Sequence, residues 1–233
     1  MAHLKTANGL LEYHSHLLFF GEHKINKGVM IENLRIFAAY LDKIDINWGP
    51  AFGTLLGIVR NNNLLPWAPV FNIYILKEDE ERFKEILGHL FLEGFELVRY
   101  ERRGLYYLRR QNEFLKIFVL HKISSDVRHT GGSDFIHEKY LQNTVKWDYE
   151  GICFNVPAEV DDYLTFQYGD WVIPRKYGIN LSKWSKYLYW LKVWIQDRLP
   201  DNFYYAWLKQ HRTRDFNRFK KLCEKNGCPL PQD

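Results

Sequence analysis

The chain has 233 residues, of which 46% are hydrophobic and 17% aromatic, so it is long enough to bury a sizeable core. Its ordinary glycine and proline content excludes a disordered or repetitive chain, and its net charge of +4 favours an anionic partner without naming one. Three cysteines cannot all pair, which favours a reducing compartment.

The first residues lack the basic start and apolar core of a signal peptide. No stretch of about 18 uninterrupted apolar residues follows anywhere in the chain. We therefore expect a cytoplasmic protein or one that lies on a membrane surface.

The first half of the chain alternates helical and extended patterns. Residues 30–46 predict a helix with one apolar face, and residues 70–76 are β-branched and aromatic enough for a strand. Residues 78–95 return to helical spacing, with acidic residues in the first turn, as the helix dipole prefers. The apolar positions of the two helices are Leu34, Phe37, Ala38, Leu41, Ile44, Phe83, Ile86, Leu87 and Leu90.

The middle of the chain reads as β-structure. Residues 95–110 predict a hairpin that turns near Gly104, residues 114–120 predict a further strand, and a second hairpin turns at Gly151. The order is helix, strand, helix, several strands and then helices. This order indicates an α+β fold and not regular βαβ alternation.

The C-terminal segment predicts an aromatic helical tail. Ser182 is a plausible N-cap for a helix over residues 183–199, Pro200 ends this helix, and a second, basic helix follows. Packing of the apolar stripe on the domain is the favoured interpretation, and a membrane interface is the alternative. The stripe consists of Trp184, Tyr187, Leu188, Leu191, Trp194 and Ile195.

The helix, glycine turn and strand of residues 30–76 have the outline of a phosphate site. In such a setting a Gly-Thr pair brings backbone N–H groups and a hydroxyl close to a phosphate, and carboxylates on the next strand hold a divalent cation. Strand alternation places those carboxylates at positions 68, 70 and 72. The residues found there are Ala68, Val70 and Asn72.

Two sequence blocks carry a resemblance to a known family. "GTLLGIVRNNNLLPW" (residues 53–67) followed by a strand, and "FNVPAEVDDYLTFQYGDWVIP" (residues 154–174), resemble the two signature blocks of the LicD and fukutin-related proteins. The resemblance divides the chain into an N-terminal extension (1–29), a LicD-like domain (30–178) and a helical tail (179–233).

The resemblance implies a nucleotidyltransferase-like mixed sheet flanked by helices. It also implies transfer of a phospho-alcohol, such as phosphocholine or ribitol phosphate, from a CDP-linked donor to a glycan acceptor. The setting would be a cell-surface or secretory-pathway glycan, as in lipopolysaccharide or capsule biosynthesis. Metal ions would neutralise the pyrophosphate in such a reaction.

The chain departs from the family pattern at the metal ligands. The later aspartate of the family falls at Lys116, and one neutral Asn amide is a poor substitute for several carboxylates. We therefore expect no metal site and no cofactor at this strand, and a catalytically impaired protein that acts by binding. The positions after the Pro-Trp pair where the family has acidic residues hold Ala68, Pro69, Val70 and Asn72.

Two other accounts of the missing aspartates stay open. The protein could be an active phosphotransferase that binds Mg or Mn through displaced carboxylates, or the block could have been altered artificially. A peripheral membrane adaptor that uses the tail is a further alternative. The candidate displaced ligands are Asp126, Asp134, Asp161, Asp162 and Asp170.

No catalytic residue can be assigned from the sequence, but a donor-binding set follows from the resemblance. Lys116 would supply positive charge where the cation would sit, although a lysine on a solvated edge strand explains it equally well. No zinc spacing, Walker loop or nucleic-acid module is present, so we expect no nucleic-acid partner. The donor-binding candidates are Gly53, Thr54, Arg60, Trp67, Asn72, Lys116 and Asp170.

Overall fold

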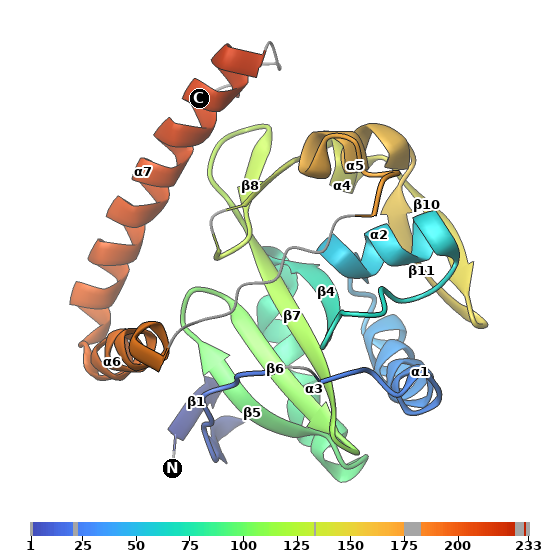
Figure 1. Cartoon of the computed structure of the whole chain (residues 1–233). Coiled ribbons are helices and arrows are strands. Elements are labelled where there is room, and N and C mark those ends of the chain that lie inside the picture. The colour runs from blue at the N-terminus through green and yellow to red at the C-terminus, as the bar shows by residue number, and fades with distance from the viewer. Residues whose placement is uncertain (1, 21–22, 133, 175–182, 227–230, 232–233) are drawn as a thin grey trace.

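The computed structural model describes residues 2–20, 23–132, 134–174, 183–226 and 231. A seven-stranded mixed sheet forms the centre, with the spatial order β3-β4-β7-β6-β5, and β8 and β9 continue from β7 (Figure 1). Its strands are β3 (Trp48–Pro50), β4 (Phe71–Leu76), β5 (Glu96–Glu101), β6 (Leu105–Arg110), β7 (Glu113–Lys122), β8 (Val127–His129) and β9 (Phe135–His137). The predicted α+β class, a mixed sheet flanked by helices, is therefore confirmed.

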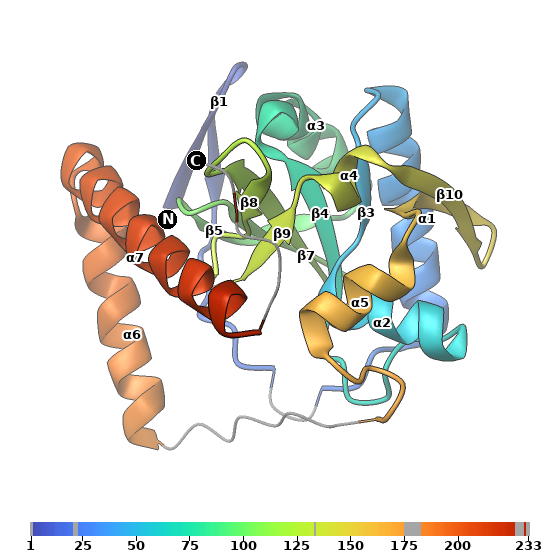
Figure 2. The ribbon, with the colours of Figure 1, turned by 90° about the horizontal axis from the view of Figure 1, so that it is seen from above.

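Helices cover the sheet on both faces. In Figure 2, α1 and α3 lie on one side, and α2, α5, α6 and α7 lie on the other. The helices are α1 (Lys27–Lys43), α2 (Phe52–Asn61), η1 (Lys77–Asp79), α3 (Glu80–Leu92), α4 (Lys139–Gln142), α5 (Val160–Tyr168), α6 (Lys183–Arg198) and α7 (Asp201–Asn226). Two separate antiparallel hairpins, β1 (Ala2–Thr6) with β2 (Gly9–Tyr13) and β10 (Thr144–Tyr149) with β11 (Ile152–Pro157), complete the fold.

The apolar helix faces predicted in the first half of the chain are buried in the core. Leu34, Phe37 and Leu41 of α1 are fully buried, as are Phe83 and Leu90 of α3. Asn26 caps α1 by accepting a hydrogen bond from the Val29 N–H at 3.3 Å. The phenyl ring of Phe83 also contacts Tyr106 on the sheet edge-on, which fixes α3 against β6.

Both predicted hairpin turns are confirmed, and both depend on glycine. Gly104 joins β5 to β6 with φ +98°, and Gly151 joins β10 to β11 with φ +75°. Both angles lie in the left-handed region, where a side chain causes strain. A third glycine is required for space: a Cβ on Gly49 in β3 would lie 2.1 Å from the Asn155 carbonyl oxygen of β11.

The expected packing of the α6 stripe is wrong. Trp184 is 71% exposed and Leu188 59% exposed, whereas Val193, which lies outside the predicted stripe, is buried. The predicted start at Ser182 lies outside the described residues. Pro200 does end α6 as expected, and the second helix is α7.

Two arginine side chains, one in β5 and one in the β5–β6 turn, decide which face of α6 points inward. Arg102 donates to the carbonyl oxygens of Leu199 (2.9 Å) and Gln196 at the C-terminus of α6, and to the Asp201 carboxylate at 2.8 Å. A cation at a helix C-terminus is favourable toward the helix dipole. Arg99 lies 3.8 Å from the Asp197 carboxylate. These polar contacts hold the Asp197 side of α6 against the domain, so the aromatic stripe faces outward.

Replacing Arg102 with alanine should loosen the helical tail. The variant loses three hydrogen bonds from one guanidinium, and we expect a loss of about 2 kcal/mol in the stability of the α6–α7 unit. Native-state hydrogen exchange of α6 amides measures this local effect. The matched control is Arg109→Ala, which removes a surface ion pair to Glu96 and should leave α6 exchange unchanged. Equal protection of α6 in both variants would contradict the anchoring role.

Candidate functional site

The first turn of α2 and the start of β4 are locked together. The Asn72 N–H donates to the Thr54 hydroxyl oxygen at 2.8 Å, and the Ala51 N–H donates to the Asn72 carbonyl oxygen at 2.9 Å. Thr54 is fully buried. This predicted phosphate-approach residue therefore positions the strand, and its hydroxyl oxygen already accepts a hydrogen bond.

The close backbone approach occurs one helical turn later than expected. A Cβ on Gly53 would meet only the Leu65 side chain, at an ordinary 3.4 Å. A Cβ on Gly57 would lie 2.7 Å from the Asn63 carbonyl oxygen and 2.9 Å from the Leu65 nitrogen. Gly57 is therefore the glycine that packing requires, and the donor-binding role of Gly53 stays a prediction.

Asn72 and Lys116 lie side by side. They are register partners in the parallel pairing of β4 with β7, so their side chains point to the same face of the sheet. The row continues across the next two strands, because Lys116 pairs with Tyr107 of β6 and Tyr107 pairs with Arg99 of β5. Two residues that the family resemblance assigned to one site are therefore adjacent in space.

The Lys116 ammonium sits over aromatic rings. Its Nζ atom lies 4.5 Å from the Phe118 ring centre and 5.3 Å from the Tyr107 ring centre. Within the described parts of the chain, no ion pair to this lysine is found within 4.0 Å. Burial lowers the pKa of Lys116 to about 8, which Glu101 and Asp134 oppose and Arg103 reinforces. The alternative of a lysine on a solvated edge strand is wrong, because β7 is central and Lys116 is half-buried.

A cluster of two arginines and one glutamate lies close to Lys116, and no sequence motif marks it. Arg99 Nε donates to Glu101 at 3.1 Å, and Arg103 Nε donates to the other oxygen of the same carboxylate at 2.7 Å. Burial opposes the ionisation of Glu101, but Arg103 and Arg99 hold its pKa below the ordinary value. Alternation along β5 could have placed residues 99 and 101 on one face. The strand order β7-β6-β5, which brings that face near Lys116, depends on tertiary pairing that the sequence does not reveal.

One of the candidate displaced ligands, Asp134, interacts electrostatically with Lys116. Desolvation raises the pKa of Asp134, and Lys116 opposes that shift. Asp162 accepts hydrogen bonds from Lys139 (2.9 Å) and Tyr140 (2.7 Å), and Asp126 accepts one from Ser124 at 2.8 Å. The two remaining candidates, Asp161 and Asp170, are exposed.

The strand positions do not fit a divalent cation. Mg²⁺ and Mn²⁺ prefer several carboxylate oxygens, whereas the adjacent pair here is an amide and an ammonium group. Over the residues that the structure describes, no group of three or more His, Cys, Asp or Glu side chains could hold a metal ion. Glu101 is also engaged on both oxygens by arginines, so it is not available as a ligand.

Arg60 connects the two sequence blocks. Its Nη1 donates to the Trp171 carbonyl oxygen at 3.2 Å, and its Nε is buried without a hydrogen-bond partner. Arg60 lies in the last turn of α2, about 9 Å along the helix from Thr54. Trp67 and Trp171 are half-buried against the core. These residues and Asp170 border α2 and α5, and no described contact joins them to Lys116.

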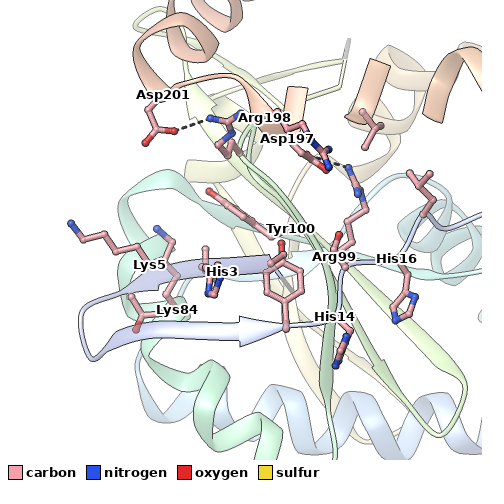
Figure 3. Close-up of a pocket in the computed structure, with 18 of the residues that line it drawn as sticks. His3, Lys5, His14, His16, Lys84, Arg99, Tyr100, Asp197, Arg198 and Asp201 are labelled. Carbon is pink, nitrogen blue, oxygen red and sulfur yellow. Dashed lines mark hydrogen bonds and ion pairs between the residues drawn. The ribbon is translucent and has the colours of Figure 1, made fainter. Parts of the chain in front are cut away.

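A separate cavity of about 1070 Å³ lies between the N-terminal hairpin, β5 and the helical tail (Figure 3). Three of the five Lys and Arg side chains that line it are ion-paired: Lys84 lies 2.7 Å from Glu81, Arg99 lies 3.8 Å from Asp197, and Arg102 lies 2.8 Å from Asp201. Neither Asn72 nor Lys116 lines it. We therefore place the candidate site at Lys116 and not in this cavity.

Comparison with known proteins gives distant relatives. No family model matches the chain. Over 155 residues it is 29% identical to an uncharacterized protein of Rickettsia typhi (65% of this chain, 48% of the relative) and, over the same length, 29% identical to one of Rickettsia prowazekii (64% and 56%). The chain thus spans about half the length of the curated relatives it matches.

Two solved structures align with most of the chain. The antibiotic-resistance factor ANT(2'')-Ia is 14% identical, with 80% of this chain and 98% of that chain covered, and has a TM-score of 0.42. A candidate nucleotidyltransferase from Thermotoga maritima is 13% identical, with 76% and 98% covered, and has a TM-score of 0.37. At these identities and TM-scores, neither likeness carries a conclusion about this chain.

Replacing Lys116 with methionine should stabilise the protein at neutral pH. The folded pKa of about 8 lies below the ordinary 10.5, so the unfolded chain binds more protons between these values and wild-type stability rises with pH there. Removing the desolvated charge should add about 2 kcal/mol at pH 7, since the cation–π contacts offset only part of the desolvation cost. Chemical denaturation at pH 7 and pH 10.5 measures the gain, which should vanish at the higher pH.

The matched control for this substitution is Lys122→Met at the exposed end of the same strand. Its stability should change by less than about 0.5 kcal/mol. A lower stability of Lys116→Met than of wild type at pH 7 would show that the ammonium makes a net favourable contact within the folded chain.

Proposed function

We propose that this chain is a LicD-related domain of nucleotidyltransferase-like fold that binds a CDP-linked phospho-alcohol donor without a metal ion. The observation that carries the proposal is Lys116, a half-buried ammonium group beside Asn72 in the β4–β7 pair. The proposed role is donor binding in the phospho-decoration of a cell-surface or secretory-pathway glycan, with catalysis impaired.

The charge of Lys116 supports an anionic ligand. An ammonium removed from water but not ion-paired costs free energy, and an incoming phosphate repays this cost by direct attraction. Lysine commonly binds phosphate as a point charge. Nearby Arg99 and Arg103 are engaged by Glu101, so Lys116 is the cation of this row that is available to a pyrophosphate.

The meeting of the two sequence blocks supports the family assignment. The hydrogen bond from Arg60 to the Trp171 carbonyl oxygen joins residues 111 apart in the sequence. The second block also approaches the proposed site, because Asp134 contributes to raising the pKa of Tyr163 and of Tyr168 in α5, where desolvation is the main cause. Both blocks therefore contribute residues to the same face of the sheet.

The proposed binding can be tested by calorimetric titration of CDP-choline and CDP-ribitol in the presence of EDTA. We expect binding that survives the chelator and weakens at least tenfold in Lys116→Ala. The Lys122→Ala variant should bind as wild type does. Binding that appears only with Mg²⁺ or Mn²⁺ would contradict the metal-free proposal, and absence of binding under all conditions would contradict donor recognition altogether.

The pH dependence provides an independent check. The donor's phosphates attract only the protonated amine, whose pKa in the free protein is about 8. Donor affinity should therefore fall about tenfold between pH 7 and pH 9. A Lys116→Arg variant keeps its charge over this range, so its affinity should stay constant. A wild-type affinity that does not change with pH would rule out Lys116 as the binding cation.

An active phosphotransferase is the second candidate, and Asp134 favours it. Desolvation raises the pKa of Asp134, and Lys116 lowers it, so the two groups interact. A protonatable carboxyl group beside a lysine could handle a proton during phosphoryl transfer. Release of CMP from the donor on adding a glycan acceptor, abolished by Asp134→Asn, would distinguish this enzyme from a binding protein.

A further inference from the structure

The outward face of α6 carries an unusual concentration of large apolar side chains. Trp184 is 71% exposed, Leu188 59%, Tyr187 50%, Ile195 45% and Trp194 43%. At 100° per residue these positions fall in a single arc of the helix. Single exposed apolar residues need no explanation, but a continuous face of this kind marks an interaction surface.

The aromatic rings of this face lie in contact along the helix. Trp184 is 5.6 Å from Tyr187, Tyr187 is 5.9 Å from Trp190, and Trp190 is 6.5 Å from Trp194, measured between ring centres. The domain already packs against another side of α6, through Val193. At one edge of the aromatic face, Trp190 and Trp194 line the cavity beside the N-terminal hairpin. The rest of the face is at least 45% exposed at each of Trp184, Tyr187, Leu188 and Ile195, and is the part that a partner can reach.

The tail is also strongly basic. Residues 183–226 contain eleven Lys and Arg and four Asp and Glu, so they carry a net charge of +7, whereas the whole chain carries +4. Within α6, the single acidic residue Asp197 lies near Arg99, while Lys186 and Lys192 are exposed on either side of the aromatic arc. Positive charge thus accompanies the apolar face.

We propose that this face of α6 binds the surface of an anionic lipid membrane. Trp and Tyr prefer the level of the lipid headgroups, where the ring is buried and the polar atom stays wet. Flanking lysines add attraction to anionic headgroups, worth about 1 kcal/mol each near the surface. The combination of exposed aromatics, flanking lysines and a basic tail fits this partner by charge as well as by apolar contact.

The dimensions favour a helix lying on the membrane over one that crosses it. The 16 residues of α6 extend about 24 Å, less than the roughly 30 Å hydrocarbon core. Over the described residues, no helix combines the length and apolar character needed to pass through a bilayer. The proposal is independent of donor binding at Lys116, since none of the α6 residues named lies in the β4–β7 pair.

Vesicle co-sedimentation tests the proposal directly. The full chain is mixed with large unilamellar vesicles of phosphatidylcholine alone, or of phosphatidylcholine with 30% phosphatidylglycerol. We expect binding to the anionic vesicles that falls at least tenfold in a Trp184→Ser, Leu188→Ser variant, and that weakens with added salt. The matched control is Phe91→Ser, Leu92→Ser at the end of α3, where the side chains are 63% and 82% exposed.

The outcomes separate lipid from other partners. Circular dichroism and thermal unfolding verify that both variants fold. A further variant, Lys192→Glu, should reduce binding to anionic vesicles at low salt and leave the protein's stability unchanged. Failure to bind anionic vesicles, or equal binding by the α6 variant and wild type, would overturn the proposal. Self-association or binding of a labelled RNA oligonucleotide that the α6 variant abolishes, without vesicle binding, would replace lipid by that partner.

Discussion

The parallel pairing of β4 with β7 is the constraint on which the rest of the structure depends. Six consecutive residue pairs, from Phe71 with Leu115 to Leu76 with Leu120, fix the register. A shift by one residue would move every side chain of β4 relative to its partners and exchange the two faces of the strand. The register sets Ile73 and Ile117 on the side of α1 and α3, and Asn72 and Lys116 on the other.

This register concentrates polar groups on one face of a central strand pair. A divalent cation would bring two positive charges to such a place and require several carboxylates around it. Here one ammonium group is present instead, and its cost is limited because its pKa falls and because aromatic rings lie beneath it. The strand keeps a positive centre, but one that requires no acidic ligands.

The neighbouring arginines show why Lys116 differs from them. The two carboxylate oxygens of Glu101 accept hydrogen bonds from Arg99 and Arg103. Such a buried, reciprocally bonded group is a structural unit, because removing one partner leaves another charge unpaired. Lys116 has no equivalent partner among the described residues. The contrast separates cations that stabilise the sheet from one that is available to an anion.

The sequence predicted elements well where one local pattern decided the outcome. Helical spacing identified the buried faces of α1 and α3, and Gly104 and Gly151 marked both turns, because period and φ are properties of a short segment. The adjacency of Asn72 and Lys116 was accessible only through the resemblance, since residues on different strands meet through tertiary pairing. The involvement of Glu101 and the buried setting of Thr54 depend on contacts that no local pattern encodes.

The predicted orientation of the apolar face of α6 was wrong for a physical reason. Helical periodicity shows that a stripe exists but not which partner covers it, and here Arg99 and Arg102 decided by holding the polar side of the helix. The tail, residues 183–226, has a net charge of +7, whereas the whole chain has a net charge of +4. The rest of the protein therefore carries a net negative charge. An anionic surface would therefore attract the tail and repel the remainder. This asymmetry would orient the molecule with the α6–α7 tail toward such a surface before any side chain inserts.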